Sequence, residues 1–372
     1  MSKKNAPFRF DIVGSFLRPQ ALKEARAQFK EGKITRDDLT KVENEEICKL
    51  VEKQKAAGLP VITDGEFRRS YWHLDFMWGF QGIKEVELSH GYFFHGEETT
   101  PGSIEVTGKI SGENHPFVEH YKFVKQLEDE NTIARQTMPA PAQLLAELYR
   151  EDNGKITDKI YPDQEELLKD IANAYRQVIK DLYDAGCRNV QFDDCTWGMF
   201  CDTKYWEARQ KDSSVTVEEE AKKYLRLNNM AIEGKPDDLV LTTHVCRGNY
   251  HSTWASSGGY APVAPFLFAD ENVDAYYLEF DDERSGGFEP LKYVSDNKKV
   301  VLGLVTTKSA KLEDKEAVIK RIHEAEKYVP LDRLCLSPQC GFASCEIGNK
   351  LTEEEQWAKL ALVKEIAEEV WG

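Results

Sequence analysis

Short, almost continuous apolar runs recur along the chain, and most of them are followed by turn residues and then by a helical stretch. The runs are rich in strand-forming residues, which is typical of buried strands. They cover residues 10–16, 59–66, 133–138, 189–194, 239–246, 275–280, 299–305 and 333–337. Runs of this kind belong to a parallel sheet that helices cover on its outer side.

Helical periodicity is clearest just before the fourth run. Apolar residues repeat there at three- and four-residue spacing, at positions 167, 168, 171, 174, 175, 178, 179 and 182. A region rich in Lys, Glu and Ala precedes the second run and ends at Gly58, and residues 357–370 have the pattern of a closing helix. Strands interleaved with helices in this way predict a (β/α)₈ TIM-type barrel, with a doubly wound sheet as the alternative.

One stretch, from about residue 67 to residue 131, interrupts this alternation. It contains the segments GYFFHG (91–96) and SIEVTGKISG (103–112), with TTPG between them. Two such segments joined by turn residues predict a β-hairpin. The expected architecture is therefore one domain over residues 1–372, a barrel with a β-rich insertion after its second strand.

Composition narrows the class of protein. The chain has 372 residues, and its 65 acidic and 49 basic residues give a net charge of −16. Nucleic acids and anionic membranes attract basic faces, so we expect neither as a partner. No apolar run approaches the roughly 20 residues of a membrane span, and the start MSKKNAPFRF lacks the apolar stretch of a secretory signal. These features predict a cytoplasmic protein with reduced cysteines.

Polar and metal-ligating residues follow several predicted strands, at the end of a barrel where chemistry takes place. They are Ser15, Asp64, Glu66, Asp193, Asp194, His244, Cys246, Glu279 and Cys340. Residues two apart on a strand share a face, so His244 and Cys246 point the same way. An imidazole and a thiolate on one face, with a second thiolate and a carboxylate nearby, suit Zn²⁺. Structural burial is the expected role of three other cysteines, Cys195, Cys201 and Cys345.

These residues stand in motifs that resemble the catalytic C-terminal half of cobalamin-independent methionine synthase and its shorter single-domain relatives. The motifs span nearly the whole chain: VGSFLRP, TDGEFRR, VQFDD, THVCRGN, YYLEF and LSPQCGF. The resemblance implies a zinc-bearing barrel whose ligands are His244, Cys246, Glu279 and Cys340. It also implies a homocysteine site, in which Glu66 and Asp193 face the ammonium group and the backbone around Ser15 faces the carboxylate.

The chemistry of such a site follows from thiol ionisation. A free thiol has a pKa of about 8.5, whereas a metal-bound thiol is deprotonated, so zinc would prepare the homocysteine sulfur for attack on a methyl group. A catalytic zinc keeps one position open, and four protein ligands leave none. We expect Glu279 to be the ligand that yields, because a carboxylate is a hard ligand on a thiolate-rich ion.

The methyl donor is where the chain departs from the family pattern. Members that use methyltetrahydrofolate carry a histidine after the seventh strand, where this chain has VTTKS (305–309). The tryptophan that stacks on the pterin is also missing, and Asp194 replaces the usual glutamate. Lys308 is then a candidate proton donor or anion contact, with a solvated surface lysine as the alternative. Trp197, or the aromatic run that begins at Tyr71, could replace the missing tryptophan.

An anionic folate needs a basic lining on an acidic protein. The candidates beyond predicted strand ends are Arg18, Arg68, Arg69 and Arg247, with ion pairing to nearby acids as the alternative. The expected function is zinc-dependent transfer of a methyl group to homocysteine, with a 5-methyltetrahydrofolate-type donor. The alternatives are another thiol acceptor, a corrinoid or other methyl donor, a metal-free decarboxylase-like barrel, and a protein that binds a metal or thiol without turnover.

Overall fold

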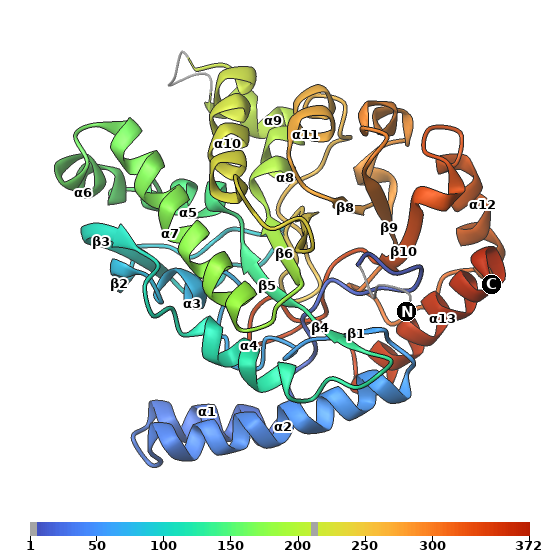
Figure 1. The fold of residues 1–372 in the computed structure, drawn as a ribbon, viewed down its shortest axis with the longest axis horizontal. Helices are drawn as coiled ribbons and strands as arrows, with labels where there is room; N and C mark the ends of the chain where they lie inside the picture. The colour runs from blue at the N-terminus through green and yellow to red at the C-terminus, as the bar shows by residue number, and fades with distance from the viewer. Residues whose placement is uncertain (1–5, 210–214) are drawn as a thin grey trace.

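The computed structural model describes residues 6–209 and 215–372, so half of the start MSKKNAPFRF lies outside the described residues. Its central element is a six-stranded parallel sheet in the order β10–β9–β8–β7–β6–β5 (Figure 1). The strands are β5 (Gln136–Pro139), β6 (Asn189–Asp194), β7 (Val240–Val245), β8 (Ala275–Glu279), β9 (Lys299–Val305) and β10 (Leu334–Pro338). All neighbours pair in parallel, so the six carboxyl ends lie at one edge of the sheet.

Shorter parallel contacts continue the arrangement on both sides of this sheet. β1 (Val61–Ile62) pairs with β4 (Ile133–Ala134), which lies just before β5 in the chain. Phe10 forms an isolated parallel bridge with Leu336 of β10. Each predicted run therefore contains a strand or a bridge, and the fold is a mixed α/β fold with parallel sheets.

The first predicted strand, residues 10–16, is reduced to that single bridge. Several of its carbonyl groups are bound by side chains of other segments, and the Ser15 carbonyl accepts from the backbone N–H of Phe342 at 3.0 Å. Thr63 Oγ1 donates to the Gly14 carbonyl at 2.7 Å, and Gln191 Nε2 donates to the Val13 carbonyl at 2.7 Å. Gly14 itself has φ +143°, outside the range of a strand. The segment is extended and anchored, but it forms no regular ladder.

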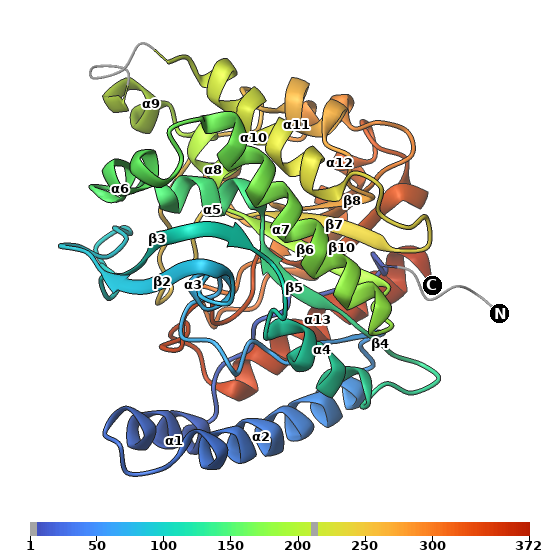
Figure 2. The ribbon, with the colours of Figure 1, turned by 60° about the vertical axis from the view of Figure 1, so that its left-hand side comes forward.

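Helices surround the strands in both ribbon views (Figures 1 and 2). They are α1 (Gln20–Lys30), α2 (Arg36–Ala56), α3 (Leu74–Met77), α4 (Phe117–Lys125), α5 (Pro141–Leu148), α6 (Asn153–Ile160), α7 (Gln164–Asp184), α8 (Thr196–Cys201), α9 (Thr203–Arg209), α10 (Val217–Ile232), α11 (Ala264–Asp270), α12 (Lys315–Ala325) and α13 (Glu353–Trp371). The 3₁₀ turns in the described residues are η1 (Glu283–Ser285), η2 (Glu289–Tyr293) and η3 (Leu331–Arg333). The predicted periodic helix is α7, and its apolar positions are buried. α2, α10 and α13 each begin with a threonine capping box, which satisfies N-terminal N–H groups.

An antiparallel pair lies between β1 and β4 in the chain. β2 (Gln81–Glu87) pairs with β3 (Gly102–Ser111), so the predicted second arm of the hairpin corresponds to β3. The predicted first arm, residues 91–96, is wrong, because it falls in the connection between the two strands. β2 exposes most of its side chains and is largely polar, so no apolar pattern marks it.

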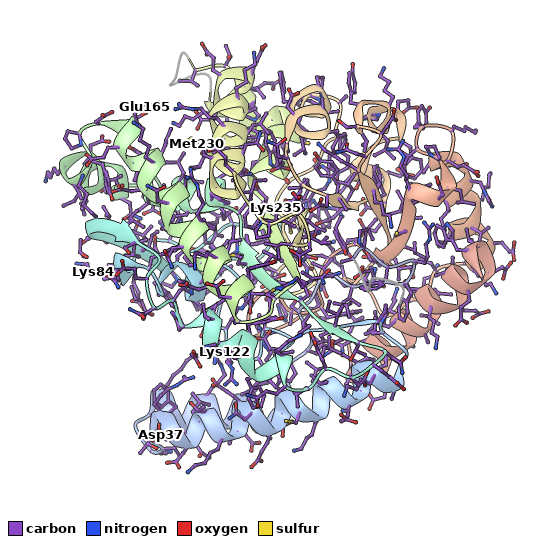
Figure 3. The ribbon with its side chains drawn as sticks, viewed as in Figure 1. Asp37, Lys84, Lys122, Glu165, Met230 and Lys235 are labelled. Atoms are coloured by element: carbon purple, nitrogen blue, oxygen red, sulfur yellow. The ribbon has the colours of Figure 1, made fainter. Side chains whose placement is uncertain are left out.

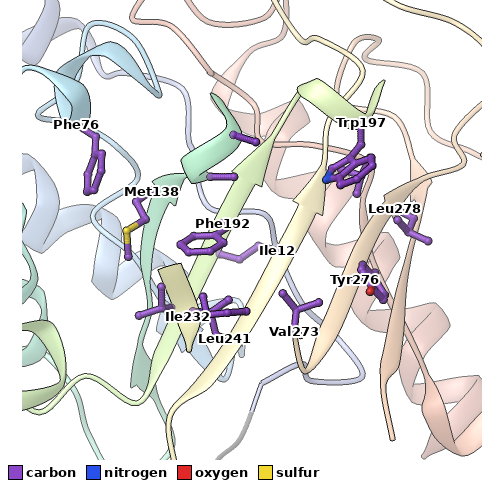
Figure 4. Close-up of a cluster of buried hydrophobic side chains, with 14 of the residues drawn as sticks. Ile12, Phe76, Met138, Phe192, Trp197, Ile232, Leu241, Val273, Tyr276 and Leu278 are labelled. Carbon is purple, nitrogen blue, oxygen red and sulfur yellow. The ribbon is translucent and has the colours of Figure 1, made fainter. Parts of the chain in front are cut away.

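Apolar side chains of the sheet and helices form the core (Figure 4). Phe192 of β6, Leu241 of β7 and Trp197 of α8 are fully buried there. Burial of each such side chain stabilises the fold by about 1.5–3 kcal/mol, and this packing holds the strand ends in register. Charged side chains such as Lys84 and Glu165 lie on the outer surface (Figure 3). Within the described chain, no helix has the length and apolar character that a membrane span needs.

Candidate metal and substrate site

Four side chains meet at the carboxyl edge of the sheet. His244 belongs to β7 and Cys246 follows that strand, Glu279 is the last residue of β8, and Cys340 lies two residues beyond β10. One candidate ligand atom from each lies within 4.8 Å of the others, and all four residues are buried. The two sulfur atoms are 3.8 Å apart. The four residues predicted as zinc ligands therefore form one cluster.

The register of neighbouring strands explains this convergence. His244 pairs with Tyr277 across β7 and β8, so Cys246 and Glu279, each two residues further along, lie at the same level. Glu279 Oε1 accepts a hydrogen bond from the backbone N–H of Arg247 at 2.8 Å. The carboxylate is thus turned back towards the end of β7, where the thiol lies.

The cluster has the donor set that a zinc ion requires. His244 Nδ1 lies 3.2 Å from the Tyr277 carbonyl oxygen, which can only accept, so Nδ1 carries the proton and Nε2 presents a lone pair. His244 Nε2 and Glu279 Oε2 are buried without a hydrogen-bond partner among the described residues. Such unpartnered atoms are rare, and a divalent cation would satisfy both of them. One imidazole nitrogen, one carboxylate oxygen and two sulfurs fit a tetrahedral zinc site.

A third thiol contacts this cluster. The Cys195 thiol and burial raise the pKa of Cys246 well above its usual range, and Cys246 together with burial does the same for Cys340. Cys195 and Cys345 also line the cavity above the cluster, whereas Cys201 is buried as expected and is not among the lining residues. The thiols of Cys246 and Cys340 hold their protons unless a positive charge lies among them.

A cavity of about 940 Å³ opens beside the cluster. Side chains at or near the strand ends line one part, and we call them the strand-end group: Ser15, Glu66, Asp193, His244, Cys246 and Cys340. Ring-bearing side chains of helices and connecting segments line much of the rest, and we call them the ring group: Tyr71, Trp72, His73, Tyr92, Phe93, Phe94, Tyr149, Phe200, Tyr205 and Tyr224. The cavity thus joins polar reactive groups to flat, largely apolar walls.

Two buried carboxylates stand in the strand-end group. Glu66 Oε1 accepts hydrogen bonds from Arg69 Nη1 at 3.1 Å and Thr137 Oγ1 at 3.0 Å, while its Oε2 has no partner in the described chain. Asp193 Oδ1 accepts from Gln191 Nε2 at 3.0 Å. Burial raises the pKa of both carboxyl groups, and Glu66 adds to the rise at Asp193. A cation placed in this part of the cavity would relieve their repulsion.

The backbone at Glu66 is held in an uncommon conformation. Its φ of +62° lies in the left-handed region that non-glycine residues rarely adopt, and Gly65 before it has φ +66°. The Asp64 carboxylate accepts the Glu66 N–H at 2.8 Å and so stabilises the turn. Asp64 therefore positions Glu66 through this hydrogen bond and is not itself among the residues that line the cavity. Local strain of this kind tends to occur at functional sites.

Ser15 is tied to the segment that follows Cys340. Its Oγ accepts a hydrogen bond from the Ala343 N–H at 3.2 Å, and its carbonyl accepts from Phe342 at 3.0 Å. A Cβ at Gly341 would lie 1.9 Å from Ser15 Oγ, so only glycine permits this approach. The segment LSPQCGF thereby places a ligand thiol and the Ser15 backbone in one wall.

Three of the four arginines predicted for a donor site lie outside the cavity lining. Arg18 donates to the carbonyl oxygens of Phe16 and Ala343, both at 2.8 Å, and Arg68 pairs with Glu43 at 3.0 Å. Neither is among the residues that line the cavity, nor is Arg69, whereas Arg247 is. The alternative, ion pairing with a nearby acid, describes Arg68, whereas Arg18 binds backbone carbonyl groups.

Asp194 and Lys308, the other two donor-site candidates, also lie outside the lining. Asp194 accepts from the Thr196 N–H at 2.9 Å and from Asn228 at 3.1 Å, on the opposite face of β6 from Asp193. Lys308 Nζ lies 3.7 Å from Glu279 Oε2 and 3.5 Å from Asp281 Oδ2. Lys308 therefore contacts the candidate ligand Glu279 from outside the cavity and does not line the cavity.

No sequence motif marks three of the lining residues, His73, Tyr92 and Glu147, which contact one another. His73 and Tyr92 are 19 residues apart in sequence, and Tyr92 and Glu147 are 55 apart. The aromatic run that begins at Tyr71 was the one available signal, and Trp72 of this run does line the cavity. Trp197, the other suggested replacement for the missing tryptophan, is buried outside the lining.

The fold and site define an α/β enzyme whose reactive groups stand at the carboxyl edge of a parallel sheet. Residues 10–369 match the family described as cobalamin-independent synthase, catalytic domain. The chain therefore belongs to this methionine-synthase-like family of methyltransferases.

Individual relatives and solved structures are similar to the chain over nearly its whole length. The Bacillus subtilis protein YxjH, which is described as uncharacterized, is 46% identical over 373 residues that cover 99% of this chain and 96% of the relative. A Listeria monocytogenes structure, described as a candidate vitamin-B12-independent methionine synthase, is 41% identical with a TM-score of 0.77 and 99% coverage of both chains. A B12-independent methionine synthase from Shewanella sp. W3-18-1, solved with selenomethionine, has the same fold, with 20% identity, a TM-score of 0.73 and 98% coverage of both chains.

Proposed function

We propose that this protein transfers a methyl group to the sulfur of homocysteine and forms methionine, with Zn²⁺ as its cofactor. The zinc ligands in this proposal are His244, Cys246, Glu279 and Cys340. The observation that carries it is the approach of their four ligand atoms to within 4.8 Å of one another beside a cavity of substrate size. Membership of a methionine-synthase-like family supports homocysteine as the acceptor.

Bound zinc would supply the positive charge that keeps a substrate thiol ionised, and therefore nucleophilic, at neutral pH. The protein's own groups prepare the place for it. The Tyr277 carbonyl holds the His244 ring with Nε2 free, while the Arg247 N–H and Lys308 face the two oxygens of Glu279 at 2.8 and 3.7 Å. Because those two contacts can hold the carboxylate by themselves, Glu279 is the ligand that we expect to yield to the substrate.

Homocysteine would be oriented by the rest of the strand-end group. Its ammonium group fits beside Glu66 and Asp193, where a positive charge offsets the repulsion between two buried carboxylates. Its carboxylate would face the backbone around Ser15, which the segment after Cys340 holds in place. Binding at both ends of the amino acid would direct the sulfur towards the cluster.

The ring group provides a place for the methyl donor. Flat aromatic side chains favour a planar ligand through stacked or edge contacts. We infer that the donor is of the 5-methyltetrahydrofolate type, and that Trp72 takes the part of the tryptophan missing after the third strand. The donor would lie against the ring group, with its methyl group towards the cluster.

The same proposal includes the closure of the strands into a barrel. We infer that the strands make a (β/α)₈ barrel in one domain over residues 1–372, with residues 67–131 as an insertion. The bridge between Phe10 and Leu336 supports closure on one side of residues 10–16. The hydrogen bond from the Phe16 N–H to the Gly65 carbonyl, at 3.1 Å, supports closure on the other.

Metal analysis tests the proposal directly. Protein purified under reducing conditions should contain about one zinc per chain, the number that one tetrahedral cluster binds. Cys340→Ser should lose this zinc and, with it, methionine formation from homocysteine and 5-methyltetrahydrofolate, by roughly a hundredfold or more, since even outer-sphere changes cost 10–100-fold. Cys335→Ser is the matched control, because Cys335 is a buried thiol of β10 that does not line the cavity. A wild-type protein that stays free of zinc after incubation with zinc and reductant would refute the proposal.

A further inference from the structure

His73, Tyr92 and Glu147 form a chain of hydrogen bonds in the wall of the cavity. His73 Nε2 lies 2.9 Å from Tyr92 Oη, and Tyr92 Oη donates to Glu147 Oε2. His73 lies just before α3, Tyr92 lies between β2 and β3, and Glu147 lies in α5. All three line the cavity. The proposed zinc and homocysteine chemistry makes no use of them.

The direction of these hydrogen bonds determines which nitrogen of His73 carries the proton. Glu147 also accepts from Ser103 Oγ and pairs with Arg150 at 3.3 Å, so its carboxylate acts as an acceptor. Tyr92 has a single proton and gives it to Glu147, and burial raises the pKa of Tyr92 well above its usual range, so that proton stays in place. The Tyr92 oxygen must therefore accept from His73, which puts the His73 proton on Nε2.

His73 Nδ1 is left as a lone-pair acceptor at the end of the chain. Burial lowers the pKa of His73 to about 3, so a second proton is not taken up near neutral pH. Nδ1 has no hydrogen-bond partner in the described chain, although the residue is 97% buried, with 3% of its surface exposed. An unsatisfied acceptor of this kind is costly, and because His73 lines the cavity, a ligand that brings a hydrogen-bond donor to Nδ1 would satisfy it.

Aromatic side chains surround the same imidazole. The Trp72 ring lies 4.6 Å from it, centroid to centroid, and is tilted by 32°. The rings of Tyr71 and Tyr92 meet it edge-on, at 6.3 and 5.3 Å. A ligand that bonds to Nδ1 would therefore lie among flat apolar surfaces, which favour a planar ring.

We propose that His73 determines the specificity for the methyl donor, because Nδ1 accepts a hydrogen bond from an N–H group of the donor's ring. Tyr92 and Glu147 are positioning residues that keep the imidazole in its accepting tautomer. This inference rests on the proposed function and names the donor as a flat heterocycle with a ring N–H, as in a reduced pterin. A sulfonium donor without such a group would leave Nδ1 unpaired, and sites built to bond such a group reject analogues that lack it.

Two measurements test the inference on the full-length, zinc-loaded protein. In ¹⁵N NMR of histidine-labelled protein, His73 should show a protonated Nε2 and a bare Nδ1 that do not change between neutral and mildly acidic pH. In calorimetry with 5-methyltetrahydrofolate, His73→Phe should raise the Kd about tenfold, as expected for one lost hydrogen bond. His73→Asn keeps a side-chain acceptor near the position of Nδ1 and should bind within about threefold of wild type.

Kinetics separate the roles of the three residues. Tyr92→Phe removes the group that fixes the tautomer, so it should raise the KM for 5-methyltetrahydrofolate while the KM for homocysteine and the zinc content stay unchanged. A protonated Nδ1 in wild type would overturn the inference, and so would equal binding by His73→Phe and wild type. Wild-type protein that binds zinc and homocysteine but not 5-methyltetrahydrofolate would overturn the donor class alone, whereas absence of zinc would overturn the proposed function.

Discussion

The strand-end group and the ring group line one cavity but are held in different ways. His244 lies in a continuous ladder, in register with Asp193 on one side and Tyr277 on the other. The ring group lies on helices and connecting segments and is held by side-chain packing, such as the contact between the Phe94 and Tyr250 rings at 5.2 Å. A backbone ladder positions atoms more tightly than loop packing does. The strand-end group therefore suits the chemical step, and the ring group suits recognition of the donor.

The connection between β2 and β3 shows how the loop side is assembled. Its His95 N–H donates to the Trp254 carbonyl at 2.9 Å, and the two rings stack at 4.7 Å. Glu97 accepts from His251 and Lys350, both at 3.0 Å. These contacts join segments more than 150 residues apart in the chain. Binding residues on loops vary more readily than those on a scaffold, so the donor side is where relatives can diverge.

Among variants that should affect the strand-end group and leave the ring group unchanged, Asp193→Asn is expected to have the largest effect. Loss of a charged partner for the ammonium group should raise the KM for homocysteine about 10–100-fold, because hydrogen bonds to charged groups contribute about 1.5–3 kcal/mol. The KM for the methyl donor should stay the same. Steady-state kinetics with each substrate varied in turn would measure both. Asp194→Asn is the matched control, because Asp194 lies on the other face of the same strand, outside the cavity lining.

Asp193→Asn, which should weaken homocysteine binding, should at the same time stabilise the folded protein at neutral pH. Burial raises the pKa of Asp193 above 3.8, so the folded protein keeps this proton at pH values where the unfolded chain has lost it. Its contribution to the free energy of unfolding must then fall as the pH rises above about 4. Asp193→Asn should flatten this decline and raise the Tm at neutral pH, which thermal unfolding at pH 5 and pH 8 would show. An unchanged Tm together with unchanged kinetics would mean that Asp193 neither contacts the substrate nor destabilises the fold as a buried carboxylate.

The same contrast explains what the sequence can predict. β6 and β9 are observed at the predicted residues, because near-continuous apolar runs mark central parallel strands, and strand ends that share an edge bring His244 and Cys340 together. Residues 10–16 resemble such a run, but side chains of other segments bind the carbonyls of Val13 and Gly14. The contact between His73 and Tyr92 joins loops, where no periodicity reports which side chains meet. Ligand roles and substrates remain predictions.

An intermediate effect on KM is expected for Lys308, and it distinguishes a role in holding Glu279 from a role in the donor site. If Lys308 holds Glu279 when that carboxylate yields, Lys308→Met should raise the KM for homocysteine about tenfold, the cost of one charge-assisted hydrogen bond. Zinc content and the KM for the donor should stay unchanged, because the side chain faces Glu279 and Asp281 and not the cavity. Substrate titrations together with elemental analysis would measure this. A rise in the donor KM alone would instead place Lys308 in the donor site and redraw the boundary between the two groups.

The smallest effect belongs to the ring group. Trp72→Leu keeps an apolar side chain but removes the flat surface beside His73, so the KM for 5-methyltetrahydrofolate should rise about threefold to fivefold, as expected for one aromatic contact. Trp78→Leu is the control, because Trp78 belongs to the same aromatic run and is not among the lining residues. Equal donor KM values for the two variants would contradict a role of Trp72 in recognition. A larger fall in kcat than in donor binding would show that loop-held rings also position the reacting methyl group, and the division between chemistry and recognition would then fail.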